Sequence, residues 1–311
     1  MNKLAKPFVK WAGGKNQLIS QIKKIIPDVV KKEPFTYIEP FVGGGAVFFW
    51  ITQNFPNIKK AVINDINQDL INSHITIKDN VLELIKVLKN IEKEYHSFGN
   101  NLQKQKEYYY SIRELFNSRK SEKTIQAALF IFLNRTCFNG LYRVNKNNEF
   151  NVPIGRYKRP TICDEENLIN VSNVLQNTII LNGDFEKTLN YAEGLTLFYM
   201  DPPYKPLNRT SNFNSYSQFG FDDNEQIRLL NFCKKLDNLG YYWILSNSDV
   251  KDEKTGKSYF ENLYYEYFIK RVFAKRHINS KADKRGELSE LLIMNYRVKR
   301  SNSYEQTISI T

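Results

Sequence analysis

Short apolar runs alternate with helical patterns along most of the chain. Apolar residues that recur every three or four positions predict helices, among them residues 18–26 and 224–239. Continuous apolar runs of a few residues predict buried strands of a parallel sheet. Such runs lie at residues 36–38, 61–63, 178–181, 195–200 and 241–245, and a late run at 291–294 is a candidate for a final strand. Because strands alternate with helices, we expect an α/β fold with a mostly parallel sheet.

The middle of the chain has a different pattern. From about residue 69 to residue 134 the apolar positions keep a helical spacing, and no strand pattern interrupts them. An irregular and basic stretch follows at residues 135–160. We therefore predict two domains. Residues 1–71 and 160–311 would form the α/β domain, and residues 72–159 would form an inserted, mainly helical domain.

Positive charge is concentrated in two segments. The 311 residues carry a net charge of +12, which favours a polyanionic partner, although a lysine-rich proteome would also raise it. Residues 131–160 and residues 271–285 each hold six basic side chains and one acidic side chain. Most of the net charge is therefore focused, and aromatic residues are interleaved with it in the first segment. This pattern favours a nucleic-acid surface over a general compositional bias.

Metal sites and membrane segments find no support in the sequence. The cysteines Cys137, Cys163 and Cys233 lie far apart, and the histidines are equally scattered, so no metal-ligand spacing is present. No apolar stretch is long enough to cross a bilayer. We expect reduced thiols in a cytoplasmic protein with no metal and no membrane partner.

The run at residues 195–200 leads directly into Asp201-Pro202-Pro203-Tyr204. The prolines fix φ and lack an N–H group, so they end the strand in a rigid turn. The carboxyl ends of parallel strands are where ligands bind in open α/β sheets. An acid and a flat ring at that point suit the binding of an amino group on a planar base. A turn with a purely structural role is the alternative.

Two glycine-rich segments supply the other candidate site residues. Glu39-Pro40-Phe41-Val42-Gly43-Gly44-Gly45 follows a predicted strand, and Asp65 stands 20 positions after Gly45. An acid at that offset is typical of ribose binding in nucleotide-binding folds. The pattern G-x-G-x-x-G is absent, so another adenosyl ligand is favoured over a dinucleotide. Trp11-Ala12-Gly13-Gly14-Lys15 places a lysine that could meet a ligand carboxylate or a flipped base, although Trp11 could be a plain core residue.

Together these motifs resemble the Dam-like family of DNA adenine-N6 methyltransferases of the α motif order. The resemblance runs from about Lys6 to Tyr296. Within the insert, residues 139–143 and 148–157 look like the segment that GATC-specific members use to read DNA. The resemblance implies a Rossmann-like methyltransferase sheet with an inserted DNA-recognition domain. It also implies S-adenosylmethionine as cofactor and double-stranded DNA as partner.

The resemblance also assigns roles to individual residues. The expected catalytic residues are Asp201, Pro202, Pro203 and Tyr204. The expected S-adenosylmethionine contacts are Trp11, Ala12, Gly13, Gly14, Lys15, Glu39, Pro40, Phe41, Gly43, Gly44, Gly45, Asp65, Ile66, Asp184, Phe185 and Asp201. The expected DNA contacts are Asn139, Leu141, Arg143, Asn145, Pro153, Arg156, Tyr157, Lys281 and Arg285. Among these, Arg143 would read a guanine, Leu141 would wedge into the duplex, and Pro153 would touch a thymine methyl group.

The predicted reaction is methyl transfer to N6 of a flipped adenine, with no covalent enzyme intermediate and no metal. Alternatives are methylation of cytosine N4, RNA or a protein glutamine, and these more often place Ser or Asn where this chain has Asp201. A nucleotide-dependent oxidoreductase would require the missing dinucleotide fingerprint. A non-catalytic DNA-binding regulator would explain the charge but not the glycine loop. We expect a monomer in a bacterial or phage setting, associated with the nucleoid.

Overall fold

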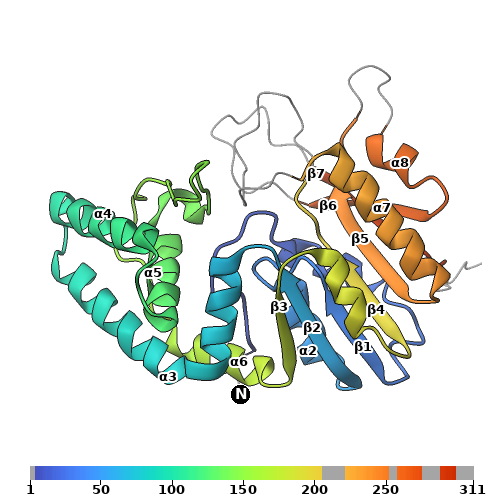
Figure 1. Ribbon diagram of the computed structural model, residues 1–311, viewed down its shortest axis with the longest axis horizontal. Coiled ribbons are helices and arrows are strands. Elements are labelled where there is room, and N and C mark those ends of the chain that lie inside the picture. Colours follow the sequence, from blue (N-terminus) through green and yellow to red (C-terminus); the bar gives the residue numbers. More distant parts are fainter. Residues whose placement is uncertain (1–3, 205–220, 252–257, 275–287, 299–311) are drawn as a thin grey trace, which may run out of the picture.

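A seven-stranded sheet forms the centre of the fold. The computed structural model describes residues 4–204, 221–251, 258–274 and 288–298. The sheet has the order β3-β2-β1-β4-β5-β7-β6 (Figure 1). The strands are β1 (Phe35–Glu39), β2 (Ile58–Asp65), β3 (Thr178–Asn182), β4 (Thr196–Met200), β5 (Tyr242–Ser248), β6 (Phe268–Ala274) and β7 (Leu288–Met294). The first five are parallel to one another, whereas β7 runs antiparallel between β5 and β6.

The predicted α/β class is confirmed, and each predicted strand lies within or overlaps an observed one. The late run at residues 291–294 belongs to β7, which pairs with both β5 and β6. Strand β6 was not anticipated. It lies at the sheet edge and carries Lys270 and Arg271 in its middle, so it lacks the apolar run of a buried strand. A charged edge strand gives little hydrophobic signal, which explains the omission.

Helices connect the strands and cover both faces of the sheet. The N-terminal segment forms η1 (Lys15–Gln17) and α1 (Ile19–Lys23), and α2 (Ala46–Asn54) links β1 to β2. The 3-10 helix η3 (Phe185–Tyr191) links β3 to β4, α7 (Asp223–Asn238) links β4 to β5, and α8 (Tyr259–Leu263) precedes β6. Helix α7 begins where the Asp222 side chain accepts hydrogen bonds from the N–H groups of Asn224 and Glu225.

The segment between β2 and β3 is helical at first and then has an irregular stretch, as the sequence predicted. It contains α3 (Gln68–Ser97), α4 (Leu102–Ser118), α5 (Lys123–Thr136), η2 (Phe138–Gly140) and α6 (Glu165–Leu175), and the irregular stretch lies between α5 and α6. Helix α3 is interrupted at Asn80, whose φ and ψ of −139° and 39° are not helical. Beyond this point α3, α4 and α5 pack together beside the sheet (Figure 1).

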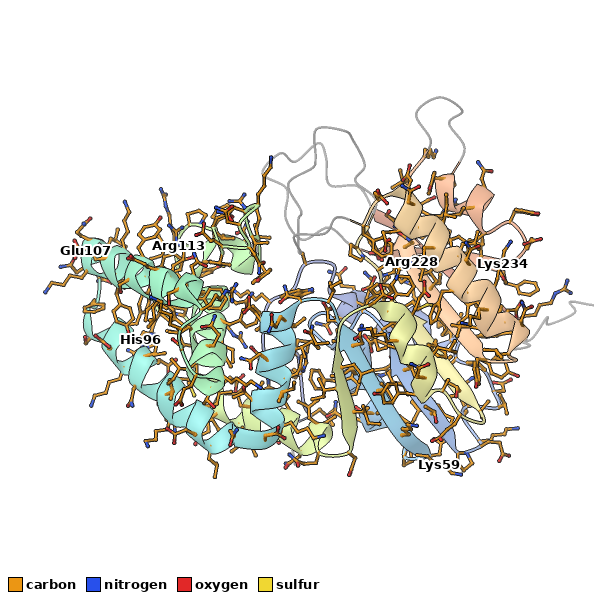
Figure 2. All side chains as sticks on the ribbon, in the orientation of Figure 1. Lys59, His96, Glu107, Arg113, Arg228 and Lys234 are labelled. Atoms are coloured by element: carbon orange, nitrogen blue, oxygen red, sulfur yellow. The ribbon has the colours of Figure 1, made fainter. Side chains whose placement is uncertain are left out.

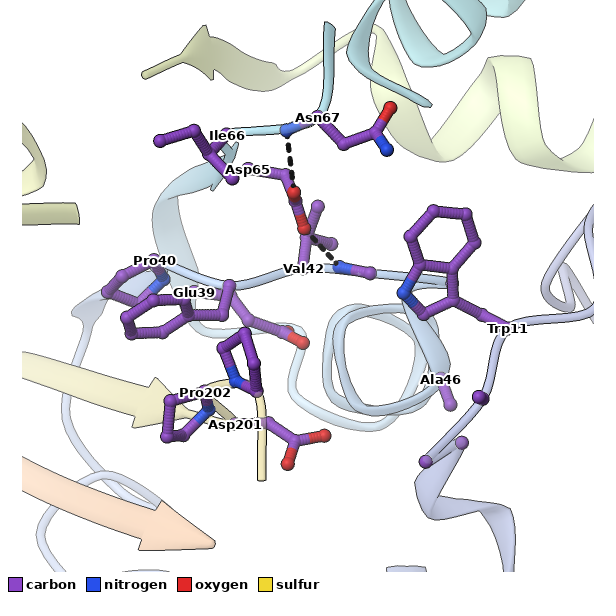
Figure 3. Close-up of a pocket in the computed structure, with 18 of the residues that line it drawn as sticks. Trp11, Glu39, Pro40, Val42, Ala46, Asp65, Ile66, Asn67, Asp201 and Pro202 are labelled. Carbon is purple, nitrogen blue, oxygen red and sulfur yellow. Dashed lines mark hydrogen bonds between the residues drawn. The ribbon is translucent and has the colours of Figure 1, made fainter. Parts of the chain in front are cut away.

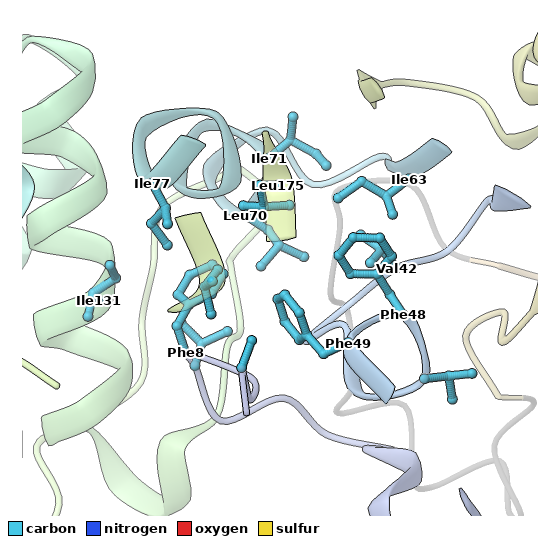
Figure 4. Packing of buried hydrophobic residues seen from close by; sticks show 14 of the residues in the cluster. Phe8, Val42, Phe48, Phe49, Ile63, Leu70, Ile71, Ile77, Ile131 and Leu175 are labelled. Atoms are coloured by element: carbon cyan, nitrogen blue, oxygen red, sulfur yellow. The ribbon is translucent and has the colours of Figure 1, made fainter. Parts of the chain in front are cut away.

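One buried apolar cluster joins the sheet to these helices. It extends from Phe48 and Phe49 of α2 through Leu70 and Ile77 of α3 to Ile131 of α5 (Figure 4). The opposite face of the sheet packs on α7 and α8 through a second cluster. The helical segment therefore shares its core with the sheet and lies beside its β3 edge (Figure 1). The division at residues 71/72 and 159/160 stays a prediction.

Candidate active site

The cavity of the molecule lies where the strand order reverses. Strands β1, β2 and β3 progress toward one edge of the sheet, and β4 and β5 progress toward the other, so a crevice forms beyond the carboxyl ends of β1 and β4. A cavity of about 1450 Å³ occupies this position. The predicted residues that line it are Trp11, Ala12, Gly13, Gly14, Lys15, Glu39, Pro40, Phe41, Gly43, Gly44, Gly45, Asp65, Ile66, Asp184, Phe185, Asp201, Pro202, Pro203 and Tyr204. Three separate sequence motifs therefore meet in one cavity.

The glycine loop after β1 is held by Asp65 at the end of β2. One Asp65 carboxylate oxygen accepts the Gly43 N–H at 3.0 Å, and the other accepts the Asn67 N–H at 2.9 Å (Figure 3). Gly43 and Gly45 have φ of 48° and 75°, a conformation that other residues adopt only at a cost. Burial raises the pKa of Asp65, and the two backbone N–H groups oppose that rise by stabilising the carboxylate.

Trp11 packs directly against this loop. A Cβ atom on Gly43 would lie 2.8 Å from Trp11 Cδ1, and one on Gly44 would lie 3.0 Å from Trp11 Cβ. The indole also stacks on Tyr142, with ring centroids 5.6 Å apart and planes at 24°. The absence of side chains on Gly43 and Gly44 therefore makes room for Trp11, and it also exposes the backbone of the loop to the cavity. Trp11 has both of the roles that its sequence context suggested, a packed residue and a cavity wall.

An ion pair between Asp201 and Lys15 lies at the end of β4. Asp201 Oδ1 is 3.0 Å from Lys15 Nζ, and its side chain is 21% exposed toward the cavity. The ammonium of Lys15 also lies 4.4 Å from the centre of the Tyr204 ring. Burial raises the pKa of Asp201 to about 6, and Lys15 restrains this rise while the nearby Glu290 adds to it. Asp201 is thus an acid whose charge changes near neutral pH.

A second buried acid lies at the end of β1. Glu39 accepts a hydrogen bond of 2.7 Å from the Tyr37 hydroxyl, and both side chains point to the same face of the strand. Burial raises the pKa of Glu39 well above its usual range, although the bond from Tyr37 works in the opposite direction. The cavity therefore has carboxyl groups at the ends of β1, β2 and β4. Such a wall favours a ligand with donor or cationic groups.

Two aromatic rings also line the cavity. Phe41 and Phe185 lie with ring centroids 5.2 Å apart, and the guanidinium of Arg228 lies 4.4 Å from the centre of the Phe185 ring. Arg228 bonds to Asp184, to Glu186 at 2.7 Å and to Glu225 at 2.8 Å. Figure 2 shows Arg228 on α7 near the carboxyl ends of the strands, whereas Lys59 of β2 lies at the opposite end of the sheet.

Sequence reasoning missed several residues of the cavity, including Asn67, Arg135 and Arg228. Arg228 stands three positions after Glu225 on α7. This spacing alone predicts only an ion pair on the surface of a helix. Only the packing of α7 against η3 brings it to the cavity. Glu290 of β7 lies next to the cavity residues Lys15 and Tyr204 and was also missed, although a single acid directly before an apolar run is a signal that could have found it.

The predicted DNA-reading residues lie together on the irregular segment after α5, outside the cavity lining. Asn139, Pro153 and Arg156 are exposed. The Arg143 Nε group donates to the Asn151 side-chain oxygen at 2.7 Å, so its guanidinium is oriented by the segment itself. The same segment is closed by two short bridges between Cys137 and Ile154 and between Val144 and Phe150.

Three further predicted DNA contacts have defined positions. The Asn145 side-chain oxygen accepts the N–H groups of residues 147 and 149 at 2.9 Å each and so shapes the turn at the tip of the segment. Leu141 is half-buried against the main cluster. The Tyr157 ring lies 4.2 Å from Lys10 Nζ. Lys281 and Arg285, with most of the second basic segment, lie outside the described residues.

No helix within the described ranges is long and apolar enough to cross a membrane. Among the same residues, no group of three or more histidine, cysteine, aspartate or glutamate side chains could hold a metal ion. The cysteines are free thiols, and burial raises the pKa of Cys137 to about 12. Cys137 is therefore a buried, unreactive thiol at the neutral pH of the cell.

A doubly wound sheet with β7 antiparallel beside β5, and a ligand cavity beyond β1, β2 and β4, defines a Rossmann-like fold of the methyltransferase type. Comparison with known families then identifies the kind of methyltransferase. The chain belongs to the D12 class N6 adenine-specific DNA methyltransferases, whose family profile matches residues 11–278. It is therefore an adenine-specific DNA methyltransferase that acts on DNA.

Individual relatives agree with this assignment. The chain is 50% identical over 295 residues to the Type II methyltransferase M.MjaIII of Methanocaldococcus jannaschii, which covers 94% of this chain and 99% of the relative. It is 39% identical to the Type II methyltransferase M1.LlaDCHI of Lactococcus lactis subsp. cremoris, covering 94% and 95%. It is 36% identical to the DNA adenine methylase of Haemophilus influenzae, covering 92% of each chain.

Among solved structures, the rRNA methyltransferase aviRa from Streptomyces viridochromogenes aligns with 93% of this chain and 89% of its own, at a TM-score of 0.36 and 9% identity. A likeness this weak adds nothing to the assignment, which rests on the family match and on the sequence relatives.

Proposed function

We propose that this enzyme transfers the methyl group of S-adenosylmethionine to N6 of an adenine that has been flipped out of double-stranded DNA, within the sequence GATC. The observation that carries this proposal is the position of Asp201 and the two prolines. They form one side of a cavity whose other side is the glycine loop braced by Asp65. An acceptor for an amino group and a nucleoside-type site thus face one space.

The chemistry of the cavity fits S-adenosylmethionine. The Asp65 carboxylate suits the ribose hydroxyls, and acidic side chains suit the cationic part of the ligand. Ile66, which is 49% exposed, and Phe185 of η3 both line the cavity, so apolar surface is available for a purine ring. When bound, S-adenosylmethionine supplies a methyl group on a sulfonium, which an amine can displace in line.

Asp201 has the central role in the proposed step. The adenine amino nitrogen is a poor nucleophile because its lone pair is delocalised into the ring. The Asp201 carboxylate and the Pro202 carbonyl can each accept one of its N–H groups, which favours a pyramidal nitrogen with its lone pair directed at the methyl carbon. This preference is for the transition state and therefore accelerates the reaction. The nitrogen loses its proton after the new bond forms, so Asp201 need not be a strong base.

The tyrosine of the motif and the insert supply the remaining contacts. The Tyr204 ring provides a stacking surface for the flipped base. Arg143, held by Asn151, presents a guanidinium suited to the acceptor edge of guanine. The choice of GATC rests on the likeness of residues 139–157 to the segment that GATC-specific members use. Exposed Arg156 and Pro153 belong to the same surface and suit contacts with phosphate and with a thymine methyl group.

The test is transfer of tritiated methyl groups to duplex DNA, followed by nucleoside analysis and mapping of the methylated sites. N6-methyladenine within GATC is expected. Methylcytosine, or methylation of RNA instead of DNA, would refute the proposal, and N6-methyladenine in another sequence would refute only GATC. Asp201→Ala should lower the transfer rate by at least about a hundredfold with DNA binding retained. The control is Asp79→Ala, an exposed acid on α3 outside the cavity.

A further inference from the structure

Glu290 lies on β7, directly before the apolar run at residues 291–294 that predicted a final strand. Side chains alternate along β7, so Glu290 shares a face with Leu292 and Met294. Those two residues belong to the buried cluster that also contains Leu18, next to η1. Glu290 is thus directed toward η1 and the cavity, and its side chain is only 16% exposed. A carboxylate on a largely buried face requires polar partners.

Its partners are two residues of the candidate active site. The Tyr204 hydroxyl donates to Glu290 Oε2 at 2.5 Å, a distance typical of a charge-assisted hydrogen bond. Lys15 Nζ lies 3.5 Å from the same oxygen. Ser246 of β5 adds a contact of 3.3 Å to the Tyr204 hydroxyl. Glu290 therefore holds the polar end of the ring that ends the catalytic motif.

Lys15 contacts the groups that the target base is proposed to use. Its ammonium lies 3.0 Å from Asp201 Oδ1 and 4.4 Å from the centre of the Tyr204 ring, and its side chain is 3% exposed. An adenine in the cavity would bring its amino group to Asp201 and its ring to Tyr204. Base and ammonium then compete for one carboxylate. A buried ammonium left without a counter-ion is strongly destabilised, so Lys15 requires a second acid.

We propose that Glu290 is a positioning residue for methyl transfer. It fixes the Tyr204 ring through the hydroxyl, and it retains the Lys15 ammonium when the adenine amino group binds Asp201. No proton moves in this exchange, and only the ion-pair partner of Lys15 changes. The inference rests on the proposed function, because it assumes that the base binds at Asp201.

The charges around Asp201 give this role a distinct signature. The ionisable groups that face Asp201 are Lys15 of η1, Glu39 of β1, Tyr199 of β4, Glu290 of β7, and Tyr204 of the turn after β4. Lys15 lowers the pKa of Asp201, and Glu290 raises it. Replacing Glu290 by a neutral amide therefore lowers the pKa of Asp201, and the acid limb of the pH–rate profile should move to lower pH.

The experiment compares Glu290→Gln with wild type in single-turnover methyl transfer to a duplex that the wild-type enzyme methylates. The rate should fall roughly tenfold or more, because the neutral amide accepts a weaker hydrogen bond from Tyr204 and leaves Lys15 without its second carboxylate. Affinities for S-adenosylmethionine and DNA should not change, and the acid limb should shift downward. Tyr204→Phe keeps the ring and removes the hydroxyl, so it should also slow transfer. Because both changes affect the same hydrogen bond, the double variant should slow transfer by less than the product of the two single effects.

The matched control is Glu261→Gln, which removes an ion pair of 2.7 Å with Arg271 and lies outside the cavity lining. It should leave the rate and the pH profile unchanged. A wild-type rate and an unshifted acid limb in Glu290→Gln would overturn the inference while leaving the proposed function intact. If Glu290→Gln fails to fold, Tyr204→Phe decides, and a wild-type rate in that variant would also overturn it. If the wild-type enzyme makes no N6-methyladenine, the proposed function itself fails.

Discussion

Gly43→Ala should destabilise the enzyme through one identifiable contact. Gly43 has a φ of 48°, and a Cβ atom at this position would lie 2.8 Å from Cδ1 and 3.0 Å from Nε1 of Trp11. Real Cβ atoms do not approach ring atoms this closely, so the loop or the indole must move. The indole cannot move freely, because it is stacked on Tyr142 with ring centroids 5.6 Å apart. The substitution therefore forces a packing change at the cavity wall.

The size of the effect can be separated into two parts. A left-handed conformation costs a residue with a Cβ atom about 1–2 kcal/mol. Inserting a methyl group into a close-packed contact costs about 1–3 kcal/mol more. Gly194 has a φ of 55° and nothing within 4 Å of the added Cβ, so Gly194→Ala carries only the first part. The difference in unfolding free energy between the two variants should thus be about 1–3 kcal/mol.

Thermal or denaturant unfolding of both variants measures this difference, and titration with S-adenosylmethionine measures its effect on the cavity. Gly43→Ala should bind the ligand more weakly, whereas Gly194→Ala should bind it like wild type. In the background of Trp11→Ala the packing part should vanish, since the clashing ring is gone. Equal losses of stability in Gly43→Ala and Gly194→Ala would refute the reasoning, because the Trp11 contact would then carry no cost.

Two further predictions concern the reaction itself. Arg143→Ala should weaken discrimination at the guanine by about 1–3 kcal/mol, measured as the ratio of methylation rates on GATC and on a site with that base changed, and an unchanged ratio would remove Arg143 from the reading role. Since burial raises the pKa of Asp201 to about 6, kcat/KM for methyl transfer should be constant above neutrality and fall as the pH drops through 6 and the carboxylate is protonated. A profile that stays flat to pH 4 would show that the charge of Asp201 is not required.

The sheet and the cavity were accessible from the sequence because their signals are local. An apolar run that ends in Asp201-Pro202-Pro203 marks both a buried strand and its carboxyl end. In a parallel sheet these ends meet at one edge, so motifs far apart in the chain could be placed in one site. The helical insert was equally visible, since a 3.6-residue period over α3 to α5 admits no strand.

Other residues were hidden because their role depends on tertiary packing. From the sequence, Arg228 is expected only to form a surface ion pair with Glu225. The position of α7 in the fold brings it into contact with Phe185 and Asp184. In the sequence, Tyr142 is one of several aromatic residues in a basic segment, and nothing marks it as a buried residue. The structure shows it buried, stacked on Trp11 and donating a hydrogen bond of 2.8 Å to Asp69. A pattern of residue types along the chain contains no information about such partners.

The alternation of side chains along the strands explains why the charged groups of the site converge. One face of the sheet packs on η1 and α2. Its side chains include Tyr37 and Glu39 of β1, Tyr199 of β4, Asp201 two positions later, and alternate residues of β5 and β7. The polar residues of that face occupy its carboxyl-end row, beyond the apolar core. Glu290 reaches the same row from the opposite direction, because β7 is antiparallel. The parallel strands reach this edge of the sheet only with their carboxyl ends. Because β7 is antiparallel, it reaches the same edge with its N-terminal half and so places Glu290 next to Tyr204.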